Sequence, residues 1–105
     1  FNRVINLANK ATSTEVKRDL LVEEEEIELF DTFNRIEESV SEYINKKAYD
    51  KALEQFLTLK EPVDKFFDHV MVMVEDEQIR ENRLSLLAKI SEKMLTICDL
   101  SKLVR

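Results

Sequence analysis

The chain has 105 residues, a net charge of −6 and one cysteine, and it contains no glycine and one proline. This length suits one domain with a single core. The lack of glycine disfavours tight hairpins and excludes glycine-dependent phosphate loops, and the lone Cys98 excludes an internal disulfide, so we expect a helical domain without disulfides.

Residues 2–11 are predicted to form a short amphipathic helix, because apolar residues recur on one face at three- and four-residue intervals. The opposite face carries a polar stripe of Arg3, Asn6 and Lys10. A connector is predicted over 12–22. Its first four residues fit a capping box that is expected to begin a short helical turn, and residues 20–22 are expected to close the core edge.

A long helix is predicted over residues 23–47. Four glutamates, 23–26, suit the N-terminal end of a helix dipole, and Lys46 and Lys47 suit the other end. The residues expected to face the core are Ile27, Phe30, Phe33, Ile36, Val40, Tyr43 and Ile44. The glutamates could bind a metal, but no histidine accompanies them, so a solvated helix face is favoured.

Two shorter helices are predicted next, over 48–60 and from Pro62, which fits a first helical turn. Their expected inward residues are Ala52, Leu53, Phe56 and Leu57, and then Val63, Phe66, Phe67, Val70 and Met71. The apolar block VMVMV, 70–74, could be a strand, a helix end or a binding surface. Because the residues before it keep helical spacing, we interpret it as a helix end and a buried connector.

The last helix is predicted from about Asp76, a suitable N-cap, to about residue 99. Its expected inward residues are Ile79, Leu84, Leu87, Ile90, Met94, Ile97 and Cys98. Arg83 has two open interpretations. Its guanidinium could pair with a carboxylate such as Asp76 or Asp68, which the residues alone favour, or it could donate to RNA.

No catalytic or metal site is predicted within the chain. His69 is the only histidine, and its neighbour Asp68 points about 100° away on a helix, so a surface or structural role is favoured. The chain opens at Phe1 inside an apparent helix and is expected to be a fragment of a longer protein. No apolar run approaches the ~18 residues of a membrane span, and a reducing, cytoplasmic setting is expected.

Two stretches carry a resemblance to a known family. EPVDKFFDHVMVMVEDEQIRENRLSLLAKI, followed by ICDLSKL, resembles the end of the β subunit of bacterial-type, heterotetrameric glycyl-tRNA synthetases. NRVINLANKA looks like the helix that opens the same domain, which is similar to the DALR anticodon-binding domain of arginyl-tRNA synthetases. The DALR segment is matched by Asp76–Arg80, with one residue more between the aspartate and the apolar position.

The resemblance implies one all-α, DALR-like bundle of about five helices over residues 1–105. It implies a parent enzyme that joins glycine to its tRNA, with ATP and Mg²⁺ bound elsewhere, so this fragment is expected to hold no cofactor, metal or catalytic residue. The implied partners are the anticodon region of glycine tRNA, the α subunit and the rest of the β subunit in a heterotetramer. Neither a membrane nor DNA is an expected partner.

The RNA-binding residues that the resemblance implies are Arg3, Asn6, Arg80 and Arg83, and proximity adds Lys10 and Asn82. The glycine anticodon ends in two cytosines, whose pairing edges suit arginine and asparagine. The acidic helix is expected to face away from the RNA, because it would repel phosphate. Alanine at position 3 or 83 is expected to weaken tRNA binding with little change in thermal stability. The alternative is a subunit-packing domain that docks through its acidic helix without RNA contact.

Overall fold

The computed structural model describes residues 2–102 and the side chains of residues 2–100. Phe1 and residues 103–105, which the sequence assigns to the same domain, lie outside the described residues. The elements are α1 (Asn2–Ala8), a 3-10 turn η1 (Arg18–Leu20), α2 (Glu24–Asn45), α3 (Tyr49–Leu57), α4 (Lys60–His69) and α5 (Glu77–Lys102). The all-α prediction is confirmed, since four helices of nine residues or more and one of seven make up this part of the chain.

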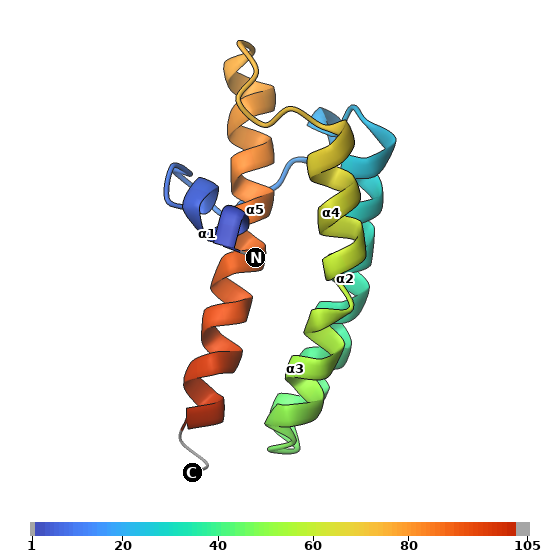
Figure 1. Cartoon of the computed structure of the whole chain (residues 1–105), viewed down its shortest axis with the longest axis vertical. Helices are drawn as coiled ribbons and strands as arrows, with labels where there is room; N and C mark the ends of the chain where they lie inside the picture. Colours follow the sequence, from blue (N-terminus) through green and yellow to red (C-terminus); the bar gives the residue numbers. More distant parts are fainter. Residues whose placement is uncertain (1, 103–105) are drawn as a thin grey trace.

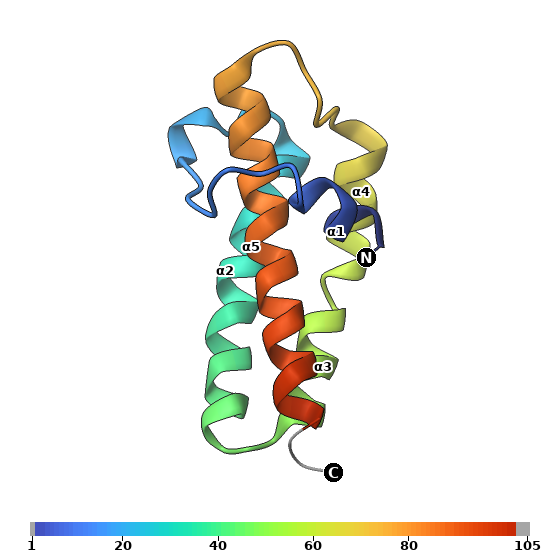
Figure 2. The ribbon, with the colours of Figure 1, turned by 90° about the vertical axis from the view of Figure 1, so that its left-hand side faces the viewer.

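The helices form an elongated bundle of 45 × 23 × 21 Å. α5 runs along one side, and α2 lies opposite with α3 and α4 packed against it, one after the other (Figure 1). α1 crosses α5 and packs on it, so the first and last helices of the chain lie in contact (Figure 2). This contact joins helices that lie more than sixty residues apart in the chain.

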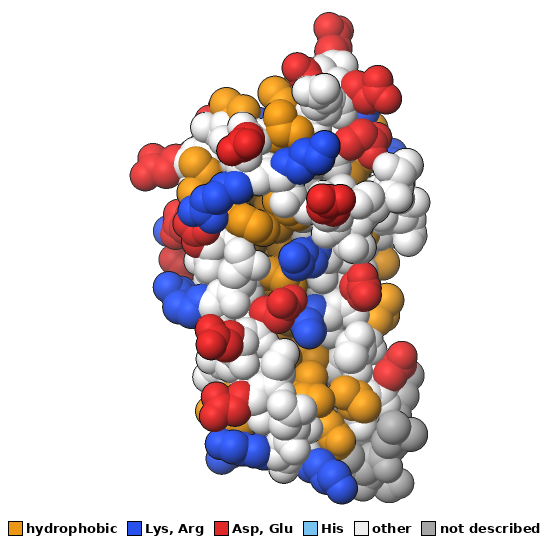
Figure 3. Space-filling view, turned by 180° about the vertical axis from the view of Figure 1, so that it is seen from behind, with side chains coloured by type: hydrophobic (Ala, Val, Ile, Leu, Met, Phe, Trp, Pro, Cys, Tyr) orange, Lys and Arg blue, Asp and Glu red, His pale blue; other side chains and the backbone are white. Residues whose placement is uncertain are grey.

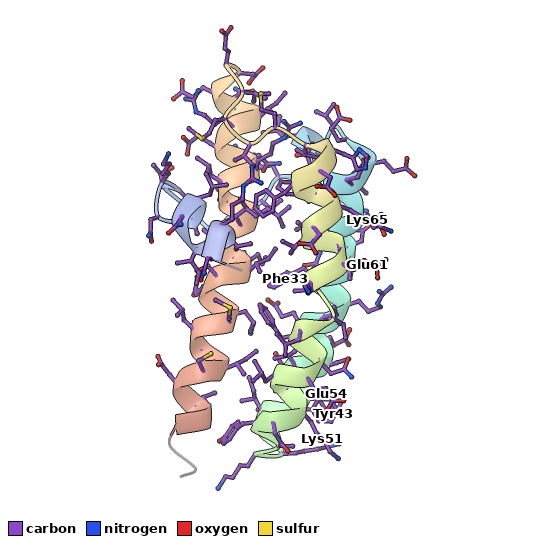
Figure 4. The ribbon with its side chains drawn as sticks, in the orientation of Figure 1. Phe33, Tyr43, Lys51, Glu54, Glu61 and Lys65 are labelled. Carbon is purple, nitrogen blue, oxygen red and sulfur yellow. The ribbon has the colours of Figure 1, made fainter. Side chains whose placement is uncertain are left out.

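The core is built largely from the apolar stripes that the helical spacing predicted, and it also contains Leu29, Leu59 and Leu86, which the spacing did not predict. Fully buried side chains come from all five helices, and the largest are Phe33, Phe56, Phe66, Leu29, Leu59, Leu84, Leu86, Leu87, Ile90 and Ile97. Phe33 points from α2 into the space shared with α5, whereas Lys51, Glu54, Glu61 and Lys65 lie on the outer side of α3 and α4 (Figure 4). Burial of these aromatic and aliphatic groups is the main force that joins the helices.

Several residues that were predicted to face the core are exposed instead. Ile27 is 36% exposed, Leu57 is 50% exposed, Met71 is 71% exposed, and Val22, expected at the core edge, is 58% exposed. Leu57 and Met71 lie at or beyond helix ends, where the backbone leaves the 3.6-residue period. Ile27 is at the margin of its stripe, and Leu29 occupies the core in that turn.

The ends of the helices differ from prediction by a few residues. α1 ends at Ala8, and Thr12–Glu15 forms no helical turn, because the Glu15 amide bonds the Ser13 hydroxyl locally. A capping box forms instead at α2, where the Glu26 carboxylate accepts from the Glu23 amide and the Glu23 side chain accepts from the amide of the third helical residue. Asp76 caps α5 as predicted, accepting from the Ile79 amide at 3.1 Å.

The VMVMV block is an irregular connector between α4 and α5. α4 ends at His69, so no residue of the block is helical and the prediction that it includes a helix end is wrong. Val70 is extended, with φ −121° and ψ 127°, and the Val74 amide donates to the Val72 carbonyl at 3.0 Å in a tight turn around Met73. Val70 and Val72 are each 6% exposed, whereas Met71 and Met73 are 71% and 49% exposed. The prediction of a fully buried connector is therefore wrong for its methionines, although the block is not a strand, as predicted.

Candidate nucleic-acid interface

Two arginines from the start of α5 hold the connector 70–74 by its backbone. Arg80 Nη1 donates to the carbonyl oxygen of Val74 at 3.2 Å, and Arg83 Nη1 donates to the carbonyl oxygen of Met71. The two guanidinium groups therefore fix both ends of the segment that carries the exposed methionines. Hydrogen bonds from charged donors are about twice as strong as neutral ones, so this segment is well anchored despite lying outside any helix.

The second hydrogen bond of Arg83 fixes it to the start of α2. Its Nη2 donates to Oε1 of Glu26 at 3.0 Å, and the Arg83 and Glu26 side chains are 6% and 0% exposed. The same carboxylate oxygen accepts from the backbone amides of Val22 and Glu23. Glu26 therefore ties together α2, α5 and, through Arg83, the connector. The prediction that all four glutamates are solvated is wrong for Glu26.

Arg83 thus has a carboxylate partner, as the favoured interpretation expected, but the partner is Glu26 rather than Asp76 or Asp68. Sequence spacing could not show this, because the pair is 57 residues apart. Glu26 Oε2 and Arg83 Nε are buried with no hydrogen-bond partner in the described part of the chain. Removing either residue would leave a charge in a buried setting.

α1 brings its polar stripe to the outer side of the connector. Arg3 and Asn6 are exposed, and with Leu7 they face residues 70–73 across a groove of about 320 Å³. The guanidinium carbon of Arg3 also lies 4.4 Å from the ring centroid of Phe67 on α4, within the range of a cation–π contact. Arg3 therefore stands at the junction of α1, α4 and the connector.

Asn82 points to a different part of the fold. Its side chain is buried, accepts from the backbone amide of Lys17 at 2.7 Å and donates to the Lys17 carbonyl at 3.1 Å. It therefore holds the 12–20 segment against α5. Thr12 adds a hydrogen bond to Glu81 at 3.1 Å. These contacts shape a hollow of about 470 Å³ whose lining includes three glutamates, an environment that disfavours RNA phosphate.

The six predicted RNA-binding residues therefore fall into three groups. Arg3, Asn6 and Lys10 are exposed on α1 or in the turn after it. Arg80 and Arg83 meet at the connector, and Asn82 lies inside, against the 12–20 segment. Whether any of them touches RNA stays a prediction.

The sequence analysis assigned no surface role to Met71 or Met73 and no buried role to Glu26. For the methionines a signal was present, since VMVMV alternates valine with methionine, and the structure buries Val70 and Val72 and exposes Met71 and Met73.

The remaining surface was predicted to hold neither a catalytic nor a metal site. No group of three or more metal-binding side chains occurs among the described residues, His69 is exposed, and Cys98 is a partly buried free thiol. Acidic and basic side chains are interspersed over the back of the bundle (Figure 3). An exposed pair joins Arg18 to Asp31 at 2.8 Å, and this hydrogen bond, with the charge of Asp31, raises the pKa of Arg18.

A comparison of the sequence with known protein families identifies the family of this domain. Residues 1–102 match the DALR anticodon binding domain. The chain belongs to this family. The resemblance on which the sequence prediction rested is thereby confirmed. The segment that the sequence analysis matched to DALR, Asp76–Arg80, begins at the N-cap of α5 and ends at an arginine that holds the connector.

The DALR domain is similar to the glycine–tRNA ligase beta subunits of several bacteria. It is 47% identical to that of Clostridioides difficile and 41% identical to that of Desulforamulus reducens, each over 104 residues. Its identity to the subunit of Bacillus subtilis is 31%, also over 104 residues. These alignments cover 99% of this chain and 15% of each relative, so the chain spans about one seventh of the proteins it matches. No helix within residues 2–102 is long and apolar enough to cross a membrane.

Proposed function

We propose that this chain is the tRNA anticodon-binding domain of a glycine–tRNA ligase beta subunit. In this role it positions glycine tRNA for ATP-dependent aminoacylation carried out elsewhere in the enzyme. The observation that carries the proposal is the match of residues 1–102 to the DALR anticodon binding domain, together with near-complete alignment to ligase beta subunits. The partners would be the α subunit and the rest of the β subunit in a cytoplasmic heterotetramer, with ATP and Mg²⁺ bound outside this domain.

The face that would meet the RNA is made by α1 and the connector. Arg3, Asn6 and Lys10 are exposed on this side, and Arg80 anchors the connector next to it. Arginine and lysine neutralise phosphates, and asparagine can read base edges in single-stranded loops. α1 packs on α5, whereas α2 packs mainly on α3 and α4, so the acidic helix lies behind α5 when α1 faces the viewer (Figure 2). This arrangement supports an approach of RNA from the α1 side.

Within this proposal Arg83 and Asn82 support the face rather than contact the RNA. Both are buried, at 5% and 4% exposure, and both use their polar groups on other parts of the chain. The tRNA would therefore meet Arg3, Asn6, Lys10 and Arg80, while the two buried residues keep the connector and the 12–20 segment in place.

The test uses the whole β subunit assembled with its α subunit. Alanine variants at Arg3, Lys10 and Arg80 are compared with wild type for binding to glycine tRNA over a salt series. We expect each variant to bind more weakly and to reduce the salt slope by about 0.7 per lost phosphate contact. An exposed lysine on the α2–α3 side, Lys51, gives the matched control, and its alanine variant should bind as wild type.

Specificity is tested with a tRNA whose two anticodon cytosines are replaced. Wild-type enzyme should bind this tRNA more weakly than the natural one, and the Asn6→Ala variant should discriminate less between the two. Unchanged binding by all four variants, with intact assembly, would contradict the RNA face. A loss of α-subunit assembly without a change in tRNA affinity would favour the subunit-packing alternative.

A further inference from the structure

We propose that the groove between α1 and the connector seats one unpaired base of the bound RNA, with Met71 and Met73 as its apolar wall. This inference rests on the proposed function and names the part of the RNA that its face would hold. Neither methionine belongs to the segment matched to DALR or to the six residues predicted to bind RNA.

The first observation is the exposure of the two methionines. Met71 is 71% exposed and Met73 is 49% exposed, whereas the valines that flank them are buried at 6%. Both therefore project away from the core, and both line the same groove. Methionine adapts its shape to flat or irregular partners, and adjacent exposed apolar side chains typically mark a binding surface.

The second observation is that the groove is held in place before any ligand arrives. Arg83 and Arg80 donate to the carbonyl oxygens of Met71 and Val74, so one anchor lies at the first methionine and the other just after the second. Arg83 is in turn fixed by the buried Glu26 carboxylate. Because the backbone is anchored on both sides of Met73, the connector's backbone loses little freedom when a ligand binds, and this reduces the entropic cost of binding.

The third observation concerns charge, and it selects a base over a phosphate. The groove lining contains one cation, Arg3, and no carboxylate. Two carboxylates, Asp64 and Asp68, lie in the neighbouring hollow on α4, which shares Arg3 with the groove. A phosphate in the groove would be repelled by these carboxylates, whereas a neutral planar base would not.

The fourth observation is that the groove carries recognition groups suited to a base. Arg3 lies over the Phe67 ring, which orients the guanidinium plane, and bases stack on arginine planes and on flat apolar surfaces. Asn6 lines the same groove and offers an amide donor and an acceptor to the edge of the base. The volume of about 320 Å³ is at the small end of ligand sites and too small for a protein helix about 10 Å wide.

The experiment compares three double variants of the β subunit assembled with the α subunit. Met71→Ala with Met73→Ala removes the wall, and Met71→Leu with Met73→Leu preserves an apolar wall. Leu57→Ala with Leu95→Ala removes two leucines of similar exposure, 50% and 52%, from other helices. We expect the first variant to bind glycine tRNA about tenfold more weakly, and the other two to bind within about twofold of wild type. The salt slope of the first variant should equal that of wild type, since no phosphate contact is lost.

A second arm identifies the base. Glycine tRNAs that carry an abasic site at one anticodon position are titrated against wild type and the alanine double variant. At the position whose base occupies the groove, wild type should lose about tenfold in affinity and the variant should show no further loss.

The outcomes separate this inference from the proposed function. If the methionine variant binds as wild type while Arg3→Ala still weakens binding, the base seat is wrong and the RNA face stands. If all abasic losses persist unchanged in the variant, the seat is also wrong. If the variant loses α-subunit assembly while the assembled enzyme keeps its tRNA affinity, the groove is a protein contact and the inference is overturned. If no variant on this face changes tRNA binding, the proposed function fails with it.

Discussion

At the scale of single residues, the buried Glu26–Arg83 pair distinguishes this chain from a simple apolar bundle. Ion pairs removed from water carry a desolvation cost, and their attraction offsets it only when both partners are present and well hydrogen-bonded. Glu26 meets two backbone amides besides Arg83, which satisfies one of its oxygens. The pair also orders the connector, so its presence serves the arrangement of the surface as much as stability.

We predict that Arg83→Ala destabilises the domain by about 3–5 kcal/mol, because it leaves the Glu26 carboxylate buried and unpaired. For a domain of this size the melting temperature should fall by more than ten degrees. This replaces the expectation from sequence that the substitution would leave thermal stability nearly unchanged. Circular dichroism melting of the β subunit and of the variant measures the difference.

Arg18→Ala is the matched control for this prediction, because it breaks an ion pair whose side chains are 63% and 49% exposed. Solvent screens the attraction in exposed pairs, so its melting curve should move little. Replacing both buried partners, as Glu26→Leu with Arg83→Met, should recover part of the lost stability, since no lone charge remains. Equal effects of Arg83→Ala and Arg18→Ala would show that burial does not set the cost.

At the scale of elements, a chain without glycine must end its helices by other means. α2 ends in a Schellman motif, in which the amide of Ala48 bonds the carbonyl of Tyr43 and the amide of Lys47 bonds that of Ile44. Lys47 occupies the left-handed position of this motif with φ 61°. Residues with a Cβ atom are disfavoured in this conformation, so Lys47 lowers the stability of the folded state at this turn.

We predict that Lys47→Gly raises stability by about 0.5–1 kcal/mol, because glycine adopts positive φ without the Cβ clash. The melting temperature should rise by a few degrees. Lys46→Gly is the control, since Lys46 has φ −89° and gains nothing from glycine. It should melt lower than wild type because it loses chain entropy. A lower melting temperature in both variants would show that the positive φ of Lys47 does not destabilise the wild-type domain.

At the scale of the whole molecule, the proposed RNA face exists only because the first helix docks on the last. α1 has seven residues, too few for a stable helix in water, so its structure depends on its contact with α5. Val4, which is fully buried, is the α1 residue that enters the main core. Arg3 and Asn6 are therefore presented to the connector only while Val4 is in place.

We predict that Val4→Ala lowers tRNA affinity, although every charged residue of the face is retained. The substitution should cost about 1–3 kcal/mol of α1 docking and expose its amides to hydrogen exchange. Val40→Ala removes the same atoms from an equally buried site on α2 and is the control. It should reduce global stability by a similar amount without changing tRNA affinity. Matching losses of affinity in the two variants would mean that α1 docking does not position the face.

The sequence alone determined the helical class, the order of the long helices and their inward stripes, because these depend on local period and capping. Phe30, Phe33, Phe56 and Phe66 were placed in the core by spacing, and Asp76 was placed as an N-cap by its residue type. The family also followed from the residues themselves. Prediction from local spacing failed most often at helix ends, where Leu57 and Met71 were expected to face the core but are exposed.

The tertiary structure alone decided which polar residues lie on a common surface. Glu26 and Arg83 are 57 residues apart, and Asn82 and Lys17 are 65 apart, so only the packing of α2 and the 12–20 segment on α5 could bring them together. The same packing buried two predicted RNA contacts and turned two methionines outward. Burial and partner choice depend on distant parts of the chain, and a local sequence pattern carries no information about them.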